Sequence, residues 1–122
     1  MHDARPTDRE LSKRLNEAIK SLEEHSVLFA VPSKVVGELN DLDIGDANDL
    51  RVLIRELLRE ISPNDYRGAR PPQKSYEKAI AGVELFAFSW RSPSLSKKMY
   101  IKFVLKNGRY YYVSLHQSRS KE

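Results

Sequence analysis

The feature that most constrains the fold is a stretch of β-favouring residues from Lys97 to His116, KKMYIKFVLKNGRYYYVSLH, that is interrupted once. The interruption is Asn107-Gly108, two residues that tolerate the left-handed backbone conformation of tight hairpin turns. Two such runs on either side of this dipeptide predict a β-hairpin. We therefore expect the C-terminal part of the chain to form two antiparallel strands.

The length of the turn decides which side chains share a face of this hairpin. With a two-residue turn, Tyr100 pairs with Leu115 and neither face is uniformly apolar. With a three-residue loop, Lys106-Asn107-Gly108, the register moves by one residue and Tyr100 lies opposite Ser114. We predict this second register because it segregates polar from apolar side chains. The apolar face then carries Met99, Ile101, Phe103, Leu105, Tyr111, Val113 and Leu115. The solvent face carries Lys98, Tyr100, Lys102, Tyr110, Tyr112, Ser114 and His116.

Upstream of the hairpin, apolar residues recur at helical spacing. Thr7 and Glu10 have the spacing of a capping box and precede an amphipathic pattern, which predicts a helix over residues 8–24. A second, weaker helix is expected to be capped by Ser33. The clearest stripe of leucine and isoleucine predicts a third helix over residues 47–61.

Between the helical part and the hairpin, the pattern changes twice. Residues 62–74 form a Pro/Gly-rich loop with several cationic side chains, and its length and composition indicate a functional loop. Residues 75–81 predict a short helix closed by Gly82. The segment VELFAFSW, residues 83–90, reads as a strand.

These elements predict an α+β fold in which N-terminal helices pack on a small antiparallel sheet that ends in a β-hairpin. Phe86, Phe88 and Trp90 fall on one face of the predicted strand, and we interpret them as core packing in preference to a platform for stacked bases. We expect one domain over residues 1–122, with four parts: a helical part (1–61), a basic loop and short helix (62–82), an antiparallel sheet (83–116) and a tail (117–122).

Charge divides the chain into two unequal halves. The net charge is +4 over 122 residues. Residues 1–61 hold nine Lys or Arg and thirteen Asp or Glu, a net charge of −4, whereas residues 62–122 hold twelve and four, a net charge of +8. An acidic half beside a basic half suggests that the C-terminal part builds a surface that binds a polyanion.

Several classes of protein are excluded by what the sequence lacks. There is no cysteine, so a disulfide framework and a thiolate site are excluded. No apolar run reaches the roughly 18 residues that span a bilayer, and the N-terminus MHDARPTDRE does not resemble a signal peptide, so we expect a cytoplasmic protein with no membrane contact. The chain has no phosphate-binding glycine loop, and its three histidines are not at metal-ligand spacing, so we expect no metal and no cofactor.

The solvent face of the predicted hairpin carries a mixture of side chains that suits single-stranded RNA. Cations neutralise phosphates, aromatic rings stack on unpaired bases, and His116 is the side chain in this group whose ordinary pKa lies nearest neutrality. Metal-independent RNA cleavage needs a base for the 2′-hydroxyl, a cation for the phosphorane and an acid for the 5′-oxygen. We expect RNA contacts from Lys98, Arg70, Lys74, Tyr110, Tyr112 and Ser114.

Two segments of the chain resemble the MqsR-type toxins of bacterial toxin–antitoxin systems, which are members of the wider RelE-like group of ribonucleases. The segments are LNDLDIGDANDLRVLIRELLREISPNDYRG and MYIKFVLKNGRYYYVSLH. In this likeness the loop lysine of the family falls at Arg67, its hairpin tyrosine at Tyr100 and its C-terminal lysine at His116. The family's Trp-Gln-Asp-Val-Tyr strand is replaced by ELFAF, so its active-site glutamine has no counterpart here.

The resemblance implies a RelE-like fold and a sequence-preferring mRNA endonuclease that a partner antitoxin neutralises. His116 would act as acid or base, and Tyr100 would position or share the proton transfer. Arg67, together with Lys102 or Lys98, would hold and stabilise the phosphate.

Two other interpretations stay open at the level of sequence. The same basic face could serve a non-catalytic module that binds RNA or an acidic protein. Alternatively, the helices predicted at 8–24 and 47–61 could dock a partner protein. That last interpretation predicts an apolar patch that the sheet leaves uncovered.

Overall fold

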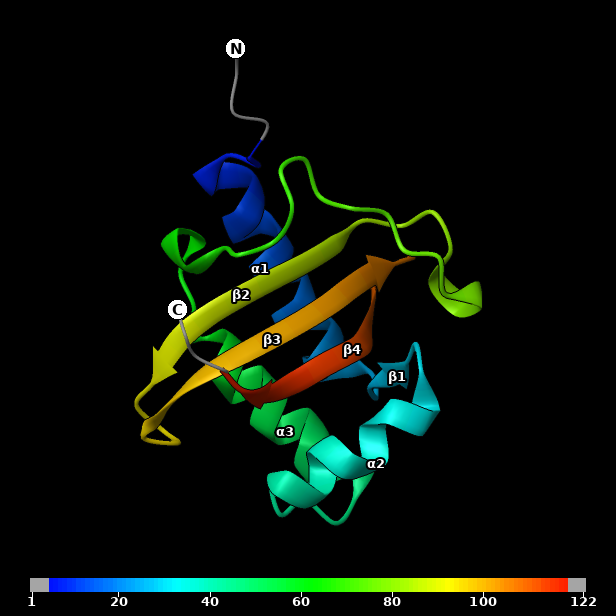
Figure 1. The fold of residues 1–122 in the computed structure, drawn as a ribbon, viewed down its shortest axis with the longest axis vertical. Helices are drawn as coiled ribbons and strands as arrows, with labels where there is room; N and C mark the ends of the chain where they lie inside the picture. The colour runs from blue at the N-terminus through cyan, green and yellow to red at the C-terminus, as the bar shows by residue number, and fades with distance from the viewer. Residues whose placement is uncertain (1–4, 119–122) are drawn as a thin grey trace.

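The computed structural model describes residues 5–118, in which three helices cover one face of a four-stranded sheet (Figure 1). The predicted α+β class is confirmed. The helices are α1 (Asp8–Glu24), α2 (Pro32–Asp41) and α3 (Ala47–Leu58). The strands are β1 (Leu28–Phe29), β2 (Leu85–Ser92), β3 (Lys97–Lys106) and β4 (Arg109–Gln117). Of the predicted tail, Gln117 belongs to β4, and residues 119–122 lie outside the described residues.

The sheet is mixed, so the prediction of a purely antiparallel sheet is wrong. Its strand order is β1-β4-β3-β2, and the short β1 runs parallel to β4 through the pairs Leu28–Tyr111 and Phe29–Tyr112. The backbone amide of Ala30 extends this contact by donating to the carbonyl of Tyr112 at 3.0 Å. A two-residue strand leaves no periodic signal in the sequence, because periodicity needs several residues to become visible.

Local hydrogen bonds fix where the helices begin. The side chain of Thr7 accepts from the amide of Glu10 at 3.1 Å, and that of Asp46 accepts from the amide of Asp49 at 2.8 Å. The helix predicted over residues 8–24 is therefore confirmed. α2 begins at Pro32 without a side-chain cap, so the predicted cap at Ser33 is wrong, and proline at the first helical position is favourable in its own right. Within the described residues, no helix is long and apolar enough to cross a bilayer.

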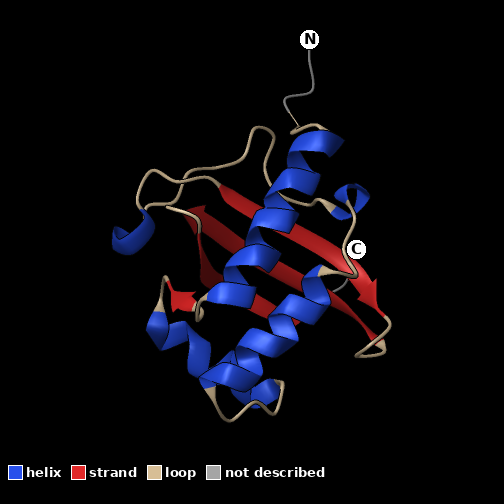
Figure 2. Cartoon of the chain, turned by 180° about the vertical axis from the view of Figure 1, so that it is seen from behind, coloured by secondary structure: helices blue, strands red, loops and turns tan. Residues whose placement is uncertain are grey.

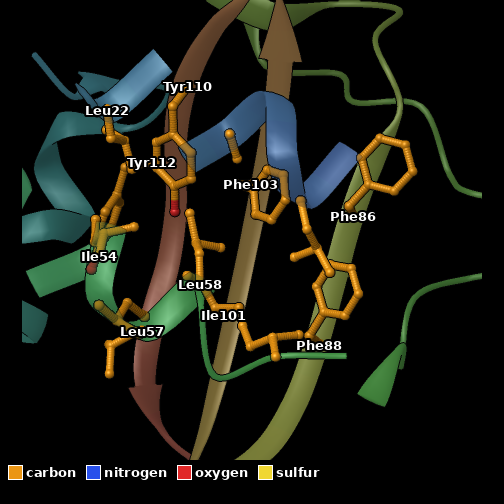
Figure 3. Close-up of a cluster of buried hydrophobic side chains, with 14 of the residues drawn as sticks. Leu22, Ile54, Leu57, Leu58, Phe86, Phe88, Ile101, Phe103, Tyr110 and Tyr112 are labelled. Atoms are coloured by element: carbon orange, nitrogen blue, oxygen red, sulfur yellow. The ribbon is translucent and has the colours of Figure 1, made fainter. Parts of the chain in front are cut away.

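The helices lie over one face of the sheet, as Figure 2 shows from behind, and the main core lies between these two layers. The rings of Phe88 and Phe103 stack with centroids 6.1 Å apart, and those of Phe103 and Tyr110 stack at 5.1 Å. Trp90 is also buried, which confirms the interpretation of the β2 aromatics as core packing. Figure 3 labels ten core side chains: Leu22, Ile54, Leu57, Leu58, Phe86, Phe88, Ile101, Phe103, Tyr110 and Tyr112.

The β3–β4 hairpin closes through a two-residue turn, so the predicted three-residue loop is wrong. Asn107 and Gly108 both have left-handed backbone angles, with φ of 54° and 73°, and Lys106 pairs with Arg109. Two successive positive φ angles are the geometry that matches the natural twist of a hairpin. Next to this turn Leu105 pairs with Tyr110, so the apolar residues of β3 share their face with alternate tyrosines of β4.

A β-bulge then changes the register in the middle of the hairpin. Phe103 pairs with Tyr112 and Lys102 pairs with Ser114, which leaves Val113 as an extra residue on β4. Beyond the bulge, Tyr100 pairs with His116. Neither of the two registers considered from the sequence describes the whole hairpin, because both assumed a single register from end to end.

The face of the sheet opposite the helices, which we call the open face, is partly covered near the hairpin turn. There Ile80 packs with Ala30, Val104 and Val113 in a small second cluster. Ile80 belongs to a single 3₁₀ turn, residues 78–80, which replaces the predicted helix over 75–81. The Nζ of Lys106 donates to the carbonyl of Ala79 at 2.8 Å and ties this turn to β3.

Glu60, which follows α3, stabilises the end of the sheet that lies away from the β3–β4 turn. Its carboxylate accepts from Trp90 Nε1 at 3.0 Å and from Ser92 Oγ at 2.7 Å. It also accepts from the amide and the hydroxyl of Ser94, in the turn between β2 and β3. Burial raises the pKa of this carboxyl, but the four hydrogen bonds favour the charged form more strongly, so the net pKa lies below the usual 4.5. Glu60 thus fastens the β2–β3 turn to the helical layer.

Candidate functional site

The uncovered part of the open face is a small polar surface that spans three strands. Cross-strand pairing places Ser89, Tyr100 and His116 in one row, because Tyr100 pairs with both of the others. The neighbouring row contains Lys102, which pairs with Ala87 on β2 and with Ser114 on β4. Alternate residues of a strand point to the same side, so Tyr100 and Lys102 are adjacent on this face.

A loop from the basic segment 62–74 borders this surface along the free edge of β2. Its two ends pair with the strand: the amide of Arg67 donates to Ala87 O, and the amide of Leu85 donates to Gln73 O, each at 2.8 Å. Figure 1 shows the loop running along the outer edge of β2. These two backbone bonds hold both ends of the loop in place beside the open face.

Tyr66 and Gly68 give the loop its internal shape. Tyr66 is buried with its ring edge against Phe88, and its hydroxyl donates to the carbonyl of Ala69 at 2.6 Å. A Cβ at Gly68 would come within 2.5 Å of the Tyr66 hydroxyl, closer than real Cβ contacts occur. Glycine is therefore required at position 68, because the loop backbone folds directly onto the tyrosine.

Loop and sheet together enclose a cleft of about 110 Å³. Three of the four predicted catalytic residues contribute to it: Arg67 from the loop, and Tyr100 and Lys102 from β3. The guanidinium of Arg67 also donates to the carbonyl of Tyr66 at 3.0 Å. The full lining is Arg67, Gly68, Ala69, Gln73, Leu85, Ala87, Tyr100 and Lys102.

The fourth predicted catalytic residue, His116, lies beside the cleft and stacks on Tyr100. The ring centroids are 5.1 Å apart and the planes are inclined by 24°. His116 Nδ1 lies 2.8 Å from the carbonyl of Gln117. Because a carbonyl oxygen can only accept, Nδ1 must carry the proton, which leaves the lone pair of the neutral imidazole on Nε2.

Burial affects the other member of this stacked pair. Desolvation raises the pKa of the Tyr100 phenol above its usual value of 10. At neutral pH the phenol is therefore protonated and can donate a hydrogen bond. The pair combines a hydrogen-bond donor on Tyr100 with an imidazole that, in its neutral form, accepts at Nε2.

Two of the predicted RNA contacts are wrong in their placement. Tyr110 and Tyr112 are fully buried on the helical side and take no part in the open face. The cause is the two-residue turn, which sets them beside Leu105 and Phe103. Tyr111, which was expected on the apolar face, lies on the opposite side next to Val104.

Ser114 is on the polar part of β4, but its hydroxyl already has a partner. It donates to the carboxylate of Glu38 at 2.8 Å, and only 8% of the residue is exposed. The same carboxylate accepts from the Tyr112 hydroxyl at 2.5 Å and from the amide of Leu115 at 2.9 Å. Burial, followed by the hydrogen bond to Glu38, raises the pKa of Tyr112. Glu38 therefore stabilises the backbone and side chains at the bulge. Nothing in the sequence of α2 indicates this role.

The remaining predicted RNA contacts are exposed but lie outside the cleft. Lys98 pairs with Arg91, so two cations lie together beyond the row of Tyr100. Arg70 and Lys74 belong to the loop and are not among the residues that line the cleft. Gln73, which was not predicted, does line it. No sequence pattern indicates Gln73 as a site residue, because its placement depends on the hydrogen bond between its own carbonyl and the amide of Leu85 in β2.

Metal-ligating clusters and exposed apolar side chains are two other features that would mark a site. Among residues 5–118, no three His, Asp or Glu side chains lie close enough together to hold a metal ion. Large apolar side chains are exposed at Val36 and Tyr76, and neither belongs to α1 or α3. The chain matches no protein-family model, no curated protein and no solved structure.

Proposed function

We propose that this protein is a metal-independent endoribonuclease that cleaves single-stranded mRNA and is the toxin of a type II toxin–antitoxin pair with a RelE-like fold. One observation carries the catalytic part of the proposal. Arg67, Tyr100 and Lys102 line one cleft, and His116 stacks on Tyr100 at its border. The resemblance of the hairpin and the preceding helical segment to MqsR-type toxins supports the biological role.

The proposed reaction is attack of a ribose 2′-hydroxyl on the adjacent phosphate. Nε2 of His116 takes the 2′-proton, O2′ forms a bond to phosphorus, and the bond from phosphorus to the 5′-oxygen breaks. The products are a 2′,3′-cyclic phosphate and a 5′-hydroxyl. The Tyr100 phenol donates a hydrogen bond to the reacting phosphate or supplies the proton that the leaving oxygen needs.

The two cations of the cleft suit the charge that develops in this reaction. The phosphorane carries one negative charge more than the phosphodiester, and Arg67 and Lys102 approach the cleft from the loop and from β3. Lys98 and Arg91 extend the positive surface along the sheet and are suited to a neighbouring phosphate. The net charge of +8 in residues 62–122 favours approach of a polyanion to this side.

A cleavage assay on single-stranded RNA in excess EDTA tests the enzymatic part. The His116→Ala variant is expected to lose about 10²-fold to 10⁴-fold in rate, the usual contribution of a general acid or base. A matched control is His25→Ala, because His25 lies at the end of α1 on the helical side. Tyr111→Phe is the control for Tyr100→Phe, since Tyr111 lies on the same face of the sheet, in β4, but outside the cleft.

Each result has a defined meaning. Products that end in a 2′,3′-cyclic phosphate, together with loss of cutting in the His116→Ala, Tyr100→Phe double variant, support the proposed mechanism. Undiminished cutting by the double variant overturns the residue assignment. Salt-sensitive RNA binding without any cleavage by the unmodified protein overturns the nuclease proposal in favour of a binding module.

The toxin part is tested by expression in bacteria. The wild-type chain is expected to arrest growth, and His116→Ala is expected to relieve the arrest at an equal protein level. Growth that is unaffected by an actively cleaving protein contradicts the assignment as a toxin and leaves the ribonuclease assignment intact.

A further inference from the structure

Tyr76 is a large aromatic side chain that the fold leaves in solvent. The residue is 91% exposed, and it stands three positions after Gln73, which lines the cleft together with Tyr100. Three residues of extended chain span at most about 11 Å, so the backbone of Tyr76 lies within that distance of Gln73. Figure 1 shows the loop continuing past the start of β2 to a short turn at the periphery of the molecule. Tyr76 is therefore near the cleft but is not part of its lining.

The backbone that carries Tyr76 is held in place on both sides of this residue. The amide of Ser75 donates to the carbonyl of Val83, and the carbonyl of Ser75 accepts from the amide of Gly82, each at 2.9 Å. The Ser75 hydroxyl accepts from the amide of Glu77 at 3.0 Å. Ser75 itself is buried. The neighbours of Tyr76 are thus fixed, whereas its own ring remains in solvent.

An isolated exposed aromatic residue is common on protein surfaces and indicates little by itself. A ring on a fixed backbone is different, because less conformational freedom is lost when a ligand binds to it. Core packing does not account for this ring, since the apolar contact between this segment and the sheet is made by Ile80, which is fully buried. The position of Tyr76 therefore suits contact with a ligand.

The segment around Tyr76 is basic, which indicates what kind of ligand it suits. Residues 67–79 contain four Arg or Lys and one Glu, a net charge of +3. Lys74 and Lys78 are exposed and lie two residues before and two residues after Tyr76. The one carboxylate of this segment, Glu77, is also exposed. An aromatic ring between cations is the combination that binds the bases and phosphates of single-stranded nucleic acids.

From these observations we infer that Tyr76 stacks on an unpaired base of the RNA strand that occupies the cleft, outside the two nucleotides joined by the cleaved bond. Lys74 and Lys78 bind the phosphates beside this base. The inference rests on the proposed ribonuclease function. Every base presents a flat π face, so the stack confers no base preference. Its effect is to increase the affinity for RNA that extends beyond the cleaved dinucleotide.

The first test measures binding of 2′-O-methyl RNA oligonucleotides, which lack the attacking hydroxyl and cannot be cleaved. A strand of about ten nucleotides is compared with an abasic strand of the same length, which keeps the phosphates but has no bases. Tyr76→Ala is expected to weaken binding of the strand with bases by about 5-fold to 150-fold, the usual loss of one base–aromatic stack. Binding of the abasic strand is expected to be unchanged.

The second test locates the stack relative to the cleaved bond. Tyr76→Ala is expected to raise KM for a cleavable strand of about ten nucleotides without changing kcat, because the stack is the same in the ground state and the transition state. Cleavage of a dinucleotide, which must occupy the cleft itself, is expected to proceed at the wild-type kcat/KM.

Two further substitutions at the same position separate stacking from general apolar contact. Tyr76→Phe keeps the ring and is expected to bind as tightly as wild type, whereas Tyr76→Leu is expected to bind as weakly as Tyr76→Ala. Val36→Ala is the matched control, since Val36 is the other exposed large apolar side chain of the described residues and belongs to α2. All four variants are expected to unfold within a few degrees of the wild-type Tm, because the side chains are exposed.

Salt dependence distinguishes the ring from its cationic neighbours. Lys78→Gln is expected to lower the slope of log affinity against log salt by about one, because one phosphate contact is lost. Tyr76→Ala is expected to lower the affinity without changing this slope, since stacking releases no counterion.

The outcomes distinguish this inference from the function on which it rests. Unchanged binding by Tyr76→Ala, an equal loss in Tyr76→Phe, or an equal loss for the abasic strand overturns the inference alone. An equal loss of kcat/KM on the dinucleotide also overturns it, because the ring would then act inside the cleft. Binding that depends on Tyr76 in a protein that never cleaves RNA overturns the nuclease and retains the stacking site. Absence of binding to any oligonucleotide overturns both.

Discussion

The β3–β4 hairpin consists of two halves that differ in what surrounds them. The turn half, residues 103–112, is covered on both faces: the helices pack on one side, and Ile80 and Ala30 pack on the other. The site half, residues 97–102 with 114–117, is covered on the helical side only, and its open face carries Tyr100, Lys102 and His116. One hairpin thus combines a rigid core segment with a surface available for chemistry.

The boundary between the halves is the bulge at Val113. If the register of the turn half continued along β4, Tyr100 would pair with Leu115, and His116 would lie on the helical side. The extra residue restores the alternation, so that His116 faces outward beside Tyr100 while Leu115 stays in the core. Bulges commonly redirect side chains next to active sites, and this one brings together the stacked pair.

Shortening β4 by one residue, either at this boundary or two residues before it, is the strongest test. Deletion of Val113 leaves every remaining cross-strand pair possible, whereas deletion of Tyr111 without a bulge moves Tyr112 out of the core. We expect the Tyr111 deletion to cost about 4 kcal/mol or more and the Val113 deletion about 2 kcal/mol, mainly from the lost burial of one side chain. Urea unfolding measures both values.

The same pair of deletions has a structural readout. Nuclear Overhauser contacts between the rings of Tyr100 and His116 are expected to persist after deletion of Val113. Equal destabilisation by both deletions, or loss of the ring contact without Val113, contradicts the role assigned to the bulge.

Substitutions on β3 compare the two halves directly. Phe103→Ala removes a fully buried ring from the turn half and is expected to lower the free energy of unfolding by about 3–5 kcal/mol. Tyr100→Ala, three residues earlier, removes a half-buried ring from the site half and is expected to cost about 1 kcal/mol. Comparable losses in chemical denaturation would show that the site half is as tightly integrated as the core.

Glu38 is the contact that secures the bulge from the helical side. Glu38→Gln keeps the shape of the side chain but exchanges a carboxylate that accepts three hydrogen bonds for an amide, so we expect a loss of about 1–3 kcal/mol. Amide exchange at Leu115 is expected to accelerate more than at Tyr110. Glu77→Gln, an exposed site, is the control. Uniform acceleration along β4 would contradict a local role for Glu38.

Glu60 anchors the site half at the β2–β3 turn, and its contribution depends on pH. Because the pKa of Glu60 is lower in the folded chain than in the unfolded chain, the stabilisation is fully present above pH about 4.5 and is lost as the pH falls through the folded pKa. Glu60→Gln is expected to cost about 1 kcal/mol at pH 7, since the carboxylate is partly solvated. The difference from wild type should shrink in acid.

The control for this last effect is Glu56→Gln, which removes surface ion pairs with Arg55 and Arg59. It is expected to change the free energy of unfolding by less than about 0.5 kcal/mol at either pH. A gap between Glu60→Gln and wild type that is constant from pH 7 to pH 3 would mean that the carboxylate does not act through its charge.

Features with local causes were predictable from the sequence. The cap at Thr7, the stripe of α3 and the hairpin around Asn107-Gly108 each depend on residues close together in the chain. The register of the hairpin was not predictable, because the bulge is fixed by Glu38, more than seventy residues away. Strand β1 was missed for a similar reason, since its only support is a distant strand.

For the candidate site, the sequence indicated which types of side chain would be present better than it indicated where they would lie. Charge and acid–base character point to Arg67, Tyr100, Lys102 and His116, and the fold brings these four to one side of the sheet. The same properties point to Tyr110 and Tyr112, which are buried. A tyrosine suits both a core and an RNA-binding face, so only the register separates the two uses.

The strand order has a consequence for synthesis on the ribosome. Among the described strands β4 comes last in the chain, yet it lies inside the sheet, between β1 and β3 (Figure 1). The helices therefore leave the ribosome before the surface that buries their apolar stripes exists. The core cannot close, and His116 cannot meet Tyr100, until the final strand has emerged. A translating ribosome would thus carry the helices without their complete sheet, and Tyr100 without His116, until β4 has been made.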